Sequence, residues 1–203
     1  MEILSNFVVL EGLDGSGTTT QLNTLEAFFQ IYKTFEPTDG IIGKIIRRTL
    51  RREIEINAET LAFLFAADRN EHLYAPGGIA ERCKRGELVV SDRYIPSSYV
   101  YQGLSCGREL PMQLNKNFPW PELLIFFDVD AETAEKRLAG RSGREIFEYL
   151  DFQKRARDLY LEVINELSGS GINIEVIDAS LSEEEVALKV RALIQKLPIM
   201  KNK

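Results

Sequence analysis

A glycine-rich stretch, GLDGSGTTT at residues 12–20, constrains this chain more than any other feature. It follows the apolar run FVVL, which ends at Leu10, and precedes a segment whose apolar residues recur at helical spacing from Leu22 to Phe29. A strand that ends in a glycine-rich turn and opens a helix aims several backbone N–H groups at one point, with the positive end of the helix dipole behind them. The sequence therefore predicts a phosphate-binding loop.

The stretch also matches most of the Walker pattern G-x-x-x-x-G-K-[ST]. Gly12, Gly17 and Thr19 fit, and the Thr19 hydroxyl is of the type that ligates magnesium between nucleotide phosphates. Thr18 stands where the pattern has lysine. A plain strand-to-helix turn is the alternative interpretation of these glycines.

Composition excludes several classes of protein. With 203 residues and 44% hydrophobic content, the chain can bury a sizeable core. A formal net charge of −6 argues against a general affinity for nucleic acid or anionic membranes, so any anion site must be local.

Cys83 and Cys106 lack metal-ligand spacing and are expected to be reduced thiols. The first apolar run is too short for a signal peptide or membrane span, so we expect a cytoplasmic protein.

Predicted strands and helices alternate along the chain. After the first strand, the predicted strands lie at 33–35, 88–90, 123–128 and 172–177, with helical segments between them. Such alternation predicts an α/β fold with a parallel sheet covered on both faces, the three-layer arrangement of P-loop NTPases. No internal repeat interrupts it, so residues 1–203 are expected to form a single domain.

Polar residues follow two of these strands, at the edge where a parallel sheet exposes strand ends to ligands. Asp92 and Arg93 come directly after a buried run. An aspartate there can hold magnesium, and an arginine can grip a transferring phosphoryl group with two hydrogen bonds. A salt-bridged strand end is the alternative. The sequence EPTDG, which begins at Glu36, forms a second polar loop at the same edge.

The end of the fourth predicted strand offers another acid. Asp128 and Asp130 could play the part of Asp92, but Asp130 also has the sequence of a helix cap, with Thr133 three residues later. Asp92 is therefore the preferred magnesium ligand.

A helix predicted to begin after Asn57 carries an aromatic ring and a guanidinium on one face. Phe65 and Arg69 stand four residues apart, and such a pair can stack on a planar base and donate hydrogen bonds to its edge. In the alternative interpretation Phe65 belongs to the core and Arg69 pairs with Asp68 or Glu71.

Two further segments are rich in arginine. Residues 140–149, with paired glycines and arginines between two predicted helices, can act as a lid that closes over phosphates. An exposed loop with ordinary charges is the alternative. The basic residues of the predicted helix at 41–52 are interpreted as a solvated face.

In this order, the motifs resemble the thymidylate kinases, a family of P-loop nucleoside-monophosphate kinases, over nearly the whole chain. The resemblance rests on the glycine-rich loop, Glu36-Pro37, residues 64–69, Asp92-Arg93-Tyr94, Ser97-Ser98, Tyr101-Gln102-Gly103, the lid arginines and residues 177–180. It implies a magnesium-dependent transfer of the γ-phosphoryl group of ATP to dTMP, giving dTDP and ADP for dTTP biosynthesis. It also implies a homodimer.

The resemblance gives each motif a role. Phe65 would stack on thymine, Arg69 would bond its carbonyl edge, and Ser98 would lie near the base. Tyr101 would stand under the deoxyribose, where a 2′-hydroxyl would clash. Glu36 would belong to the same acceptor site.

Other residues would serve the phosphates. Arg93 would hold the acceptor phosphate against the γ-phosphoryl group, Asp14 would reach the sugar 3′-hydroxyl or the acceptor phosphate, and Arg141 and Arg144 would come from the lid. ATP would bind Gly12, Leu13, Asp14, Gly15, Ser16, Gly17, Thr18 and Thr19. Magnesium would lie near Thr19, Asp92 and Glu148.

The chain departs from the family pattern at several positions. Besides Thr18, Phe35 stands where the family often has arginine, residues 38–40 replace a glycine pair, and the lid is short. Basic residues in the lid are typical of the bacterial type. Thr18 also permits a second hypothesis, a degenerate P-loop protein that binds nucleotides without turnover. Retention of Asp14, Arg93 and Tyr101 favours the enzyme.

Overall fold

The computed structural model describes residues 2–139 and 146–201. Its centre is a parallel sheet of five strands in the order β2-β3-β1-β4-β5. The strands are β1 (Ile3–Gly12), β2 (Ile31–Phe35), β3 (Leu88–Asp92), β4 (Trp120–Asp128) and β5 (Ile174–Asp178). The predicted α/β class is therefore confirmed. β2, β3, β4 and β5 differ from the predicted ranges by one to three residues at their ends.

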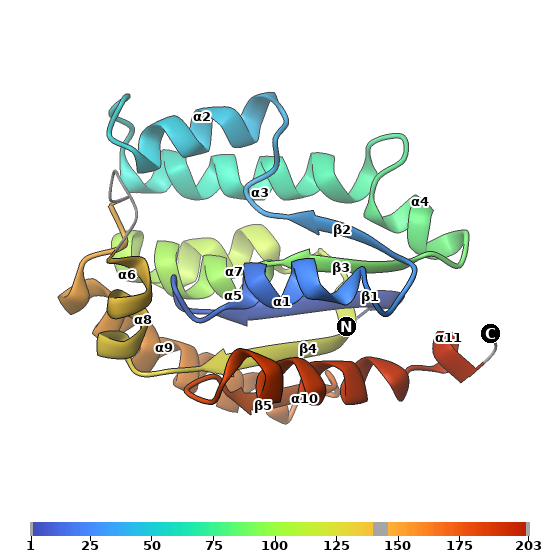
Figure 1. Ribbon diagram of the computed structural model, residues 1–203. Helices are drawn as coiled ribbons and strands as arrows, with labels where there is room; N and C mark the ends of the chain where they lie inside the picture. Colours follow the sequence, from blue (N-terminus) through green and yellow to red (C-terminus); the bar gives the residue numbers. More distant parts are fainter. Residues whose placement is uncertain (1, 140–145, 202–203) are drawn as a thin grey trace.

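Helices cover both faces of this sheet (Figure 1). α1 (Thr18–Leu25) and α10 (Glu183–Gln195) lie side by side on one face, while α5 (Ile95–Ser97) and α9 (Leu150–Ser168) cover the other. The remaining helices are α2 (Ile41–Leu50), α3 (Ala58–Tyr74), α4 (Ile79–Lys84), α6 (Gly103–Cys106), α7 (Glu109–Asn115), α8 (Ala131–Leu138) and α11 (Pro198–Lys201). A single π-helical turn, η1 (Ser98–Gln102), joins α5 to α6.

The core lies between the sheet and these helices. The inner strands β1, β3 and β4 supply its centre, because their middle residues are buried on both faces, as expected for a parallel sheet. No helix among the described residues is long and apolar enough to span a bilayer. Cys83 and Cys106 are free thiols.

Local capping signals set the starts of two helices. The Asn57 side chain accepts a hydrogen bond from the backbone N–H of Thr60, 2.7 Å away, and so caps α3. Asp130 caps α8 in the same way through Thr133, also at 2.7 Å. Both caps are as predicted, and the second engages both carboxylate oxygens of Asp130 with Thr133.

The loop between β1 and α1 requires glycine. Gly15 has a φ of 87°, and a Cβ added there would lie 2.4 Å from the carbonyl oxygen of Ala134 in α8. Gly17, with a φ of 100°, occupies the N-cap of α1. Only a residue without Cβ adopts this backbone freely, so the chain can curl closely around a point at the start of the helix.

Candidate active site

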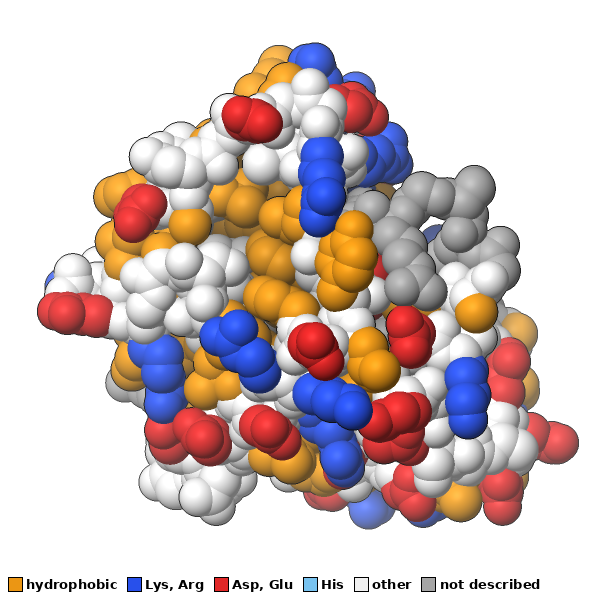
Figure 2. Space-filling view, turned by 90° about the vertical axis from the view of Figure 1, so that its left-hand side faces the viewer, with side chains coloured by type: hydrophobic (Ala, Val, Ile, Leu, Met, Phe, Trp, Pro, Cys, Tyr) orange, Lys and Arg blue, Asp and Glu red, His pale blue; other side chains and the backbone are white. Residues whose placement is uncertain are grey.

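Two cavities open at the carboxyl edge of the sheet, the face shown in Figure 2. The first, which we call the P-loop cavity, has about 530 Å³ and lies among residues 13–21, α8, the loop before α10, and α10 itself. The second, the acceptor cavity, has about 660 Å³ and is lined by the ends of β2 and β3, by α2, α3 and η1, and by Phe147. Asp14, Thr19 and Arg93 line both, so the cavities meet at these three side chains.

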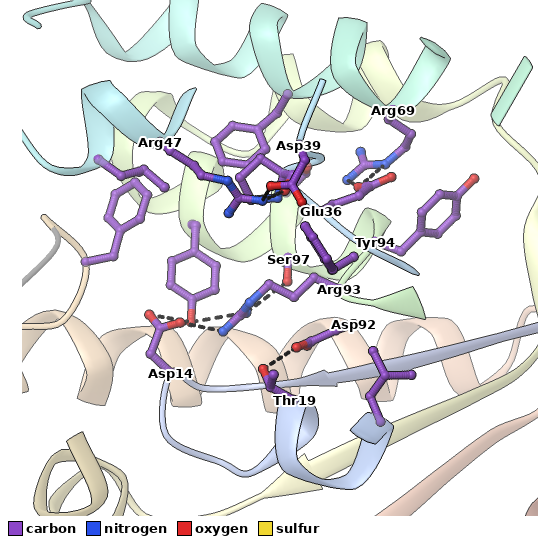
Figure 3. Close-up of a pocket in the computed structure, with 18 of the residues that line it drawn as sticks. Asp14, Thr19, Glu36, Asp39, Arg47, Arg69, Asp92, Arg93, Tyr94 and Ser97 are labelled. Atoms are coloured by element: carbon purple, nitrogen blue, oxygen red, sulfur yellow. Dashed lines mark hydrogen bonds and ion pairs between the residues drawn. The ribbon is translucent and has the colours of Figure 1, made fainter. Parts of the chain in front are cut away.

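Arg93 lies at this meeting point (Figure 3). Its Nη2 lies 2.5 Å from Asp14 Oδ1, and its Nη1 donates to the carbonyl of Gly12 at 3.0 Å and to Ser97 Oγ at 3.1 Å. The guanidinium also lies over the ring of Tyr101, 5.2 Å from its centroid. An arginine fixed between the cavities can reach a phosphate in either one.

Thr19 and Asp92 form an oxygen pair below Arg93. Thr19 Oγ1 donates to Asp92 Oδ2, and the other carboxylate oxygen, Oδ1, is buried without a hydrogen-bond partner. A hydroxyl beside an unpartnered carboxylate oxygen fits a hard cation such as Mg²⁺, which prefers oxygen ligands. Within the described part of the chain, no three His, Cys, Asp or Glu side chains form a metal-holding group. A magnesium ion here would thus depend on phosphate oxygens and water.

The predicted third magnesium residue is less directly placed. Glu148 is half-buried and follows Phe147 of the acceptor cavity, but it is not among the described residues that line either cavity. Thr18, at the Walker lysine position, is buried at the start of α1 and lines the P-loop cavity. The two lid arginines, Arg141 and Arg144, lie outside the described residues.

The far end of the acceptor cavity is built around a buried ion pair. Arg69 donates through Nε (3.0 Å) and Nη2 (2.6 Å) to the same Glu36 oxygen, Oε2, and through Nη1 to Asn115. Burial alone would raise the pKa of Glu36, but the Arg69 guanidinium and a hydrogen bond from His72 lower it below its ordinary value. Arg69 is thus held rigidly, 4.9 Å from the centroid of the Tyr94 ring.

The alternative partners considered for Arg69 are wrong. Asp68 accepts two hydrogen bonds from Thr38 instead, both of 2.7 Å, and Arg69 pairs with Glu36 rather than with Asp68 or Glu71. Phe65 lines the acceptor cavity and is half-buried, also packing against the core. The aromatic and cationic side chains predicted to share a face therefore do reach one cavity.

Two residues that line the acceptor cavity carry buried polar atoms without partners. Ser98 Oγ and Gln102 Nε2 are buried, have no hydrogen-bond partner, and belong to residues that line the acceptor cavity. Buried polar groups are normally satisfied, so these two are available to a ligand. Tyr101, between them in sequence, places its hydroxyl 3.3 Å from Asp14 Oδ2, and burial raises its pKa.

The sequence model of the thymidylate kinase family matches residues 10–190 of this chain. The chain belongs to this family. A relative from Treponema pallidum (strain Nichols), which is assigned as a thymidylate kinase, is 41% identical over 198 residues, covering 95% of each chain. A "probable thymidylate kinase" of Pyrobaculum aerophilum is 40% identical over 193 residues, covering 94% of this chain and 97% of the relative. The solved thymidylate kinase of Candida albicans shares the fold, with a TM-score of 0.85, 22% identity, and coverage of 97% and 93%.

Two residues of this thymidylate kinase family member that contact the site, one of them outside the cavity linings, were not found from sequence. Gln153 of α9 donates to Asp14 Oδ2 at 3.0 Å and to the carbonyl of Phe147 at 2.6 Å. Arg47 of α2 lines the acceptor cavity, donates to the Pro37 carbonyl and lies 3.5 Å from Asp39 Oδ1. The interpretation of the α2 basic residues as a solvated face is therefore wrong for Arg47, because α2 lies over the EPTDG loop. No local pattern in the sequence signals either contact.

Proposed function

We propose that this chain transfers the γ-phosphoryl group of ATP to dTMP, giving dTDP and ADP. The observation that carries this proposal is the junction of two cavities at Asp14, Thr19 and Arg93. Phosphoryl transfer needs the donor and acceptor phosphates in line, with cationic groups where charge shifts between them. A cavity on each side of one arginine meets that requirement.

The P-loop cavity suits the phosphates of ATP. Backbone N–H groups at the start of α1 face it, and the helix dipole favours negative charge there. Magnesium, held by Thr19 and Asp92 with Glu148 as a further candidate, would neutralise charge on the phosphates when bound. Among the described residues, the cationic side chains that line this cavity are Arg93 and Arg137.

The acceptor cavity suits a thymine nucleotide. Contacts to Glu36 and Asn115 use three of the five N–H groups of Arg69, so donors remain for the carbonyl edge of the base. Phe65 would stack on thymine, while Ser98 and Gln102 offer unpartnered polar atoms. Tyr101 would stand under the sugar and exclude a 2′-hydroxyl.

The phosphate end of the acceptor would replace part of an existing contact. Arg93 is paired with Asp14, and an incoming phosphate would compete for the guanidinium while Asp14 turns to the sugar hydroxyl. From the sequence we further propose that Arg141 and Arg144 close over the phosphates as a lid, as in the bacterial type. A single kinase domain over residues 1–203 and a homodimer complete the proposal.

One observation favours a second candidate, a P-loop protein that binds nucleotides without turnover. Thr18 is buried and cannot supply the positive charge that the Walker lysine brings to the β- and γ-phosphates. The arginine fixed where the two cavities meet opposes this candidate, since a protein that only binds nucleotides has no need of a phosphoryl-transfer arrangement.

A coupled assay with ATP, Mg²⁺ and a panel of acceptors separates the two candidates. We expect turnover with dTMP to exceed turnover with dUMP, CMP and AMP. No turnover with any acceptor, together with measurable binding of ATP and dTMP, would establish the binding protein instead.

A further inference from the structure

A fully buried carboxylate, Glu11, lies close to Arg93 but outside the described linings of both cavities. It is the penultimate residue of β1 and accepts hydrogen bonds through both of its oxygens. Oε1 accepts from the backbone N–H groups of Tyr94 (2.8 Å) and Ser97 (3.2 Å). Oε2 accepts from the hydroxyls of Ser97 (2.7 Å) and Tyr160 (3.0 Å).

The two sets of contacts fix both the backbone and the guanidinium of Arg93. Arg93 has a φ of 74°, in the left-handed region that a long side chain rarely adopts, and the N–H of the next residue is bound by Glu11. At the other end, its Nη1 donates to Ser97 Oγ at 3.1 Å and lies 3.4 Å from the Tyr160 hydroxyl. Figure 3 shows Ser97 beside the guanidinium as it points toward Asp14.

The direction of the hydroxyl protons matters for this arrangement. When Glu11 is ionised, its Oε2 takes the protons of both hydroxyls, so the oxygens of Ser97 and Tyr160 present lone pairs to Arg93. Tyr160 itself is fully buried, stacked on Phe126 with centroids 5.2 Å apart. It cannot touch a nucleotide, so any effect it has on one must pass through other residues.

We propose that Glu11 and Tyr160 are positioning residues for the acceptor phosphate: through the hydroxyls and the turn at Tyr94, they hold Arg93 where the two cavities meet. This inference rests on the proposed function, in which Arg93 binds the phosphate of dTMP. Tyr160, carried by α9, thereby acts on a phosphate that it never contacts.

The test compares two ligands that differ only in the phosphate. Dissociation constants for dTMP and for thymidine are measured by calorimetry on the full chain and on Tyr160→Phe, which keeps the buried ring. Loss of one hydrogen bond to a charged group predicts a dTMP dissociation constant raised by about tenfold, with thymidine unchanged. Glu11→Gln, which reverses the hydroxyl protons, should act in the same direction. Val190→Ala, a buried truncation in α10, lowers stability without touching these groups and should bind both ligands as the wild type does.

A double-mutant cycle shows whether the effect passes through Arg93. In an Arg93→Lys background, Tyr160→Phe should add little further loss of dTMP affinity, because the two changes remove the same interaction. Unchanged dTMP affinity in Tyr160→Phe, equal losses for dTMP and thymidine, or full additivity with Arg93→Lys would each overturn the inference. If the wild type binds thymidine as tightly as dTMP, the phosphate role of Arg93 fails first, and the positioning role falls with it.

Discussion

The guanidinium of Arg69 and the carboxylate of Glu36 form an ion pair that is almost completely withdrawn from solvent, with 2.6 Å between Nη2 and Oε2. Arg69 comes from the middle of α3 and Glu36 from the residue that follows β2. The arginine proposed to recognise the base is thus also the partner of a buried charge. On this proposal, one side chain serves both the stability of the fold and the recognition of the acceptor.

Replacing Arg69 with Ala should therefore have two separable effects. It leaves the Glu36 charge uncompensated, which we expect to lower the free energy of unfolding by about 3–5 kcal/mol. It also removes the donors proposed for thymine, so the KM for dTMP should rise strongly while the KM for ATP stays near the wild-type value. Urea unfolding and steady-state kinetics measure the two effects.

The double variant Arg69→Ala, Glu36→Gln is the matched comparison. It removes both charges, so part of the lost stability should return, whereas the dTMP affinity should not. Recovery of the dTMP KM along with stability would mean that Arg69 only supports the fold.

Tyr101 should set the preference for deoxyribose. Its ring is buried among Phe147, Phe152 and Tyr160, which holds it in place at the cavity wall. Tyr101→Ala should narrow the ratio of kcat/KM between dTMP and its ribose counterpart, because space opens for the 2′-hydroxyl. Tyr101→Phe keeps the ring and should keep the ratio. Both kcat/KM values are measured on the same protein, so a loss of folded protein lowers them equally and leaves their ratio unchanged. An unchanged ratio in Tyr101→Ala, relative to the wild type, would refute the steric role.

Helices and strands could be predicted from short stretches of sequence because the interactions that start and end them join residues close together in the chain. A cap such as Asn57 needs a partner only three residues away, and the glycine-rich loop needs only its own backbone and the helix that follows. The alternation of elements then limits the fold to a covered parallel sheet. The presence of most predicted site residues at one sheet edge follows from that topology.

The partners of those residues could not be predicted, since they come from distant parts of the chain. Arg69 was expected to pair, if at all, within α3, but the sheet brings Glu36 against it from 33 residues away. The contact of Gln153 with Asp14 spans 139 residues, and that of Tyr160 with Glu11 spans 149. The contacts of Gln153 and Tyr160 depend on how α9 packs across the sheet. The spacing of residues along the sequence carries no information about that packing.

The stability of the protein should depend on pH through Glu11. Burial raises the pKa of Glu11 from 4.5 to about 7, despite the opposing effects of the Arg93 charge and the hydrogen bonds from Ser97, Tyr94 and Tyr160. The folded state thus binds a proton that the unfolded chain has already released, so this carboxyl costs stability as pH rises from 4.5 to about 7. The full cost is on the order of 3 kcal/mol.

Glu11→Gln removes that titration. The free energy of unfolding of the wild type, relative to this variant, should fall between about pH 5 and pH 7 and then stay level. Among the described residues, Arg93 and Tyr160 are the charged or titratable side chains that face Glu11, and both keep their protonation state over this range. A difference that does not change with pH would show that Glu11 titrates normally.

We expect arginines to supply the positive charge that a lysine at position 18 would bring to the phosphates. From the sequence we place Arg144 first among these, so Arg144→Ala should lower kcat by at least about a hundredfold, with little change in the KM for ATP. Thr18→Lys should recover part of that loss in the Arg144→Ala background and help less in the wild type, since groups that stabilise the same charge are not additive. A kcat near the wild-type value in Arg144→Ala would move the search to Arg93, Arg141 or another chain. The structure adds Arg137, whose Nη1 lies 3.5 Å from the Ser16 carbonyl in the P-loop.

The central claim is that phosphoryl transfer takes place between the two cavities, and the most direct measurement follows the phosphoryl group itself. The purified protein is incubated with Mg²⁺, dTMP and ATP labelled in its γ-phosphate, and the nucleotides are then separated. We expect the label in dTDP, with an equal amount of ADP, and no transfer when thymidine replaces dTMP. Label that stays in ATP or appears only as inorganic phosphate, while both nucleotides bind, would contradict the claim.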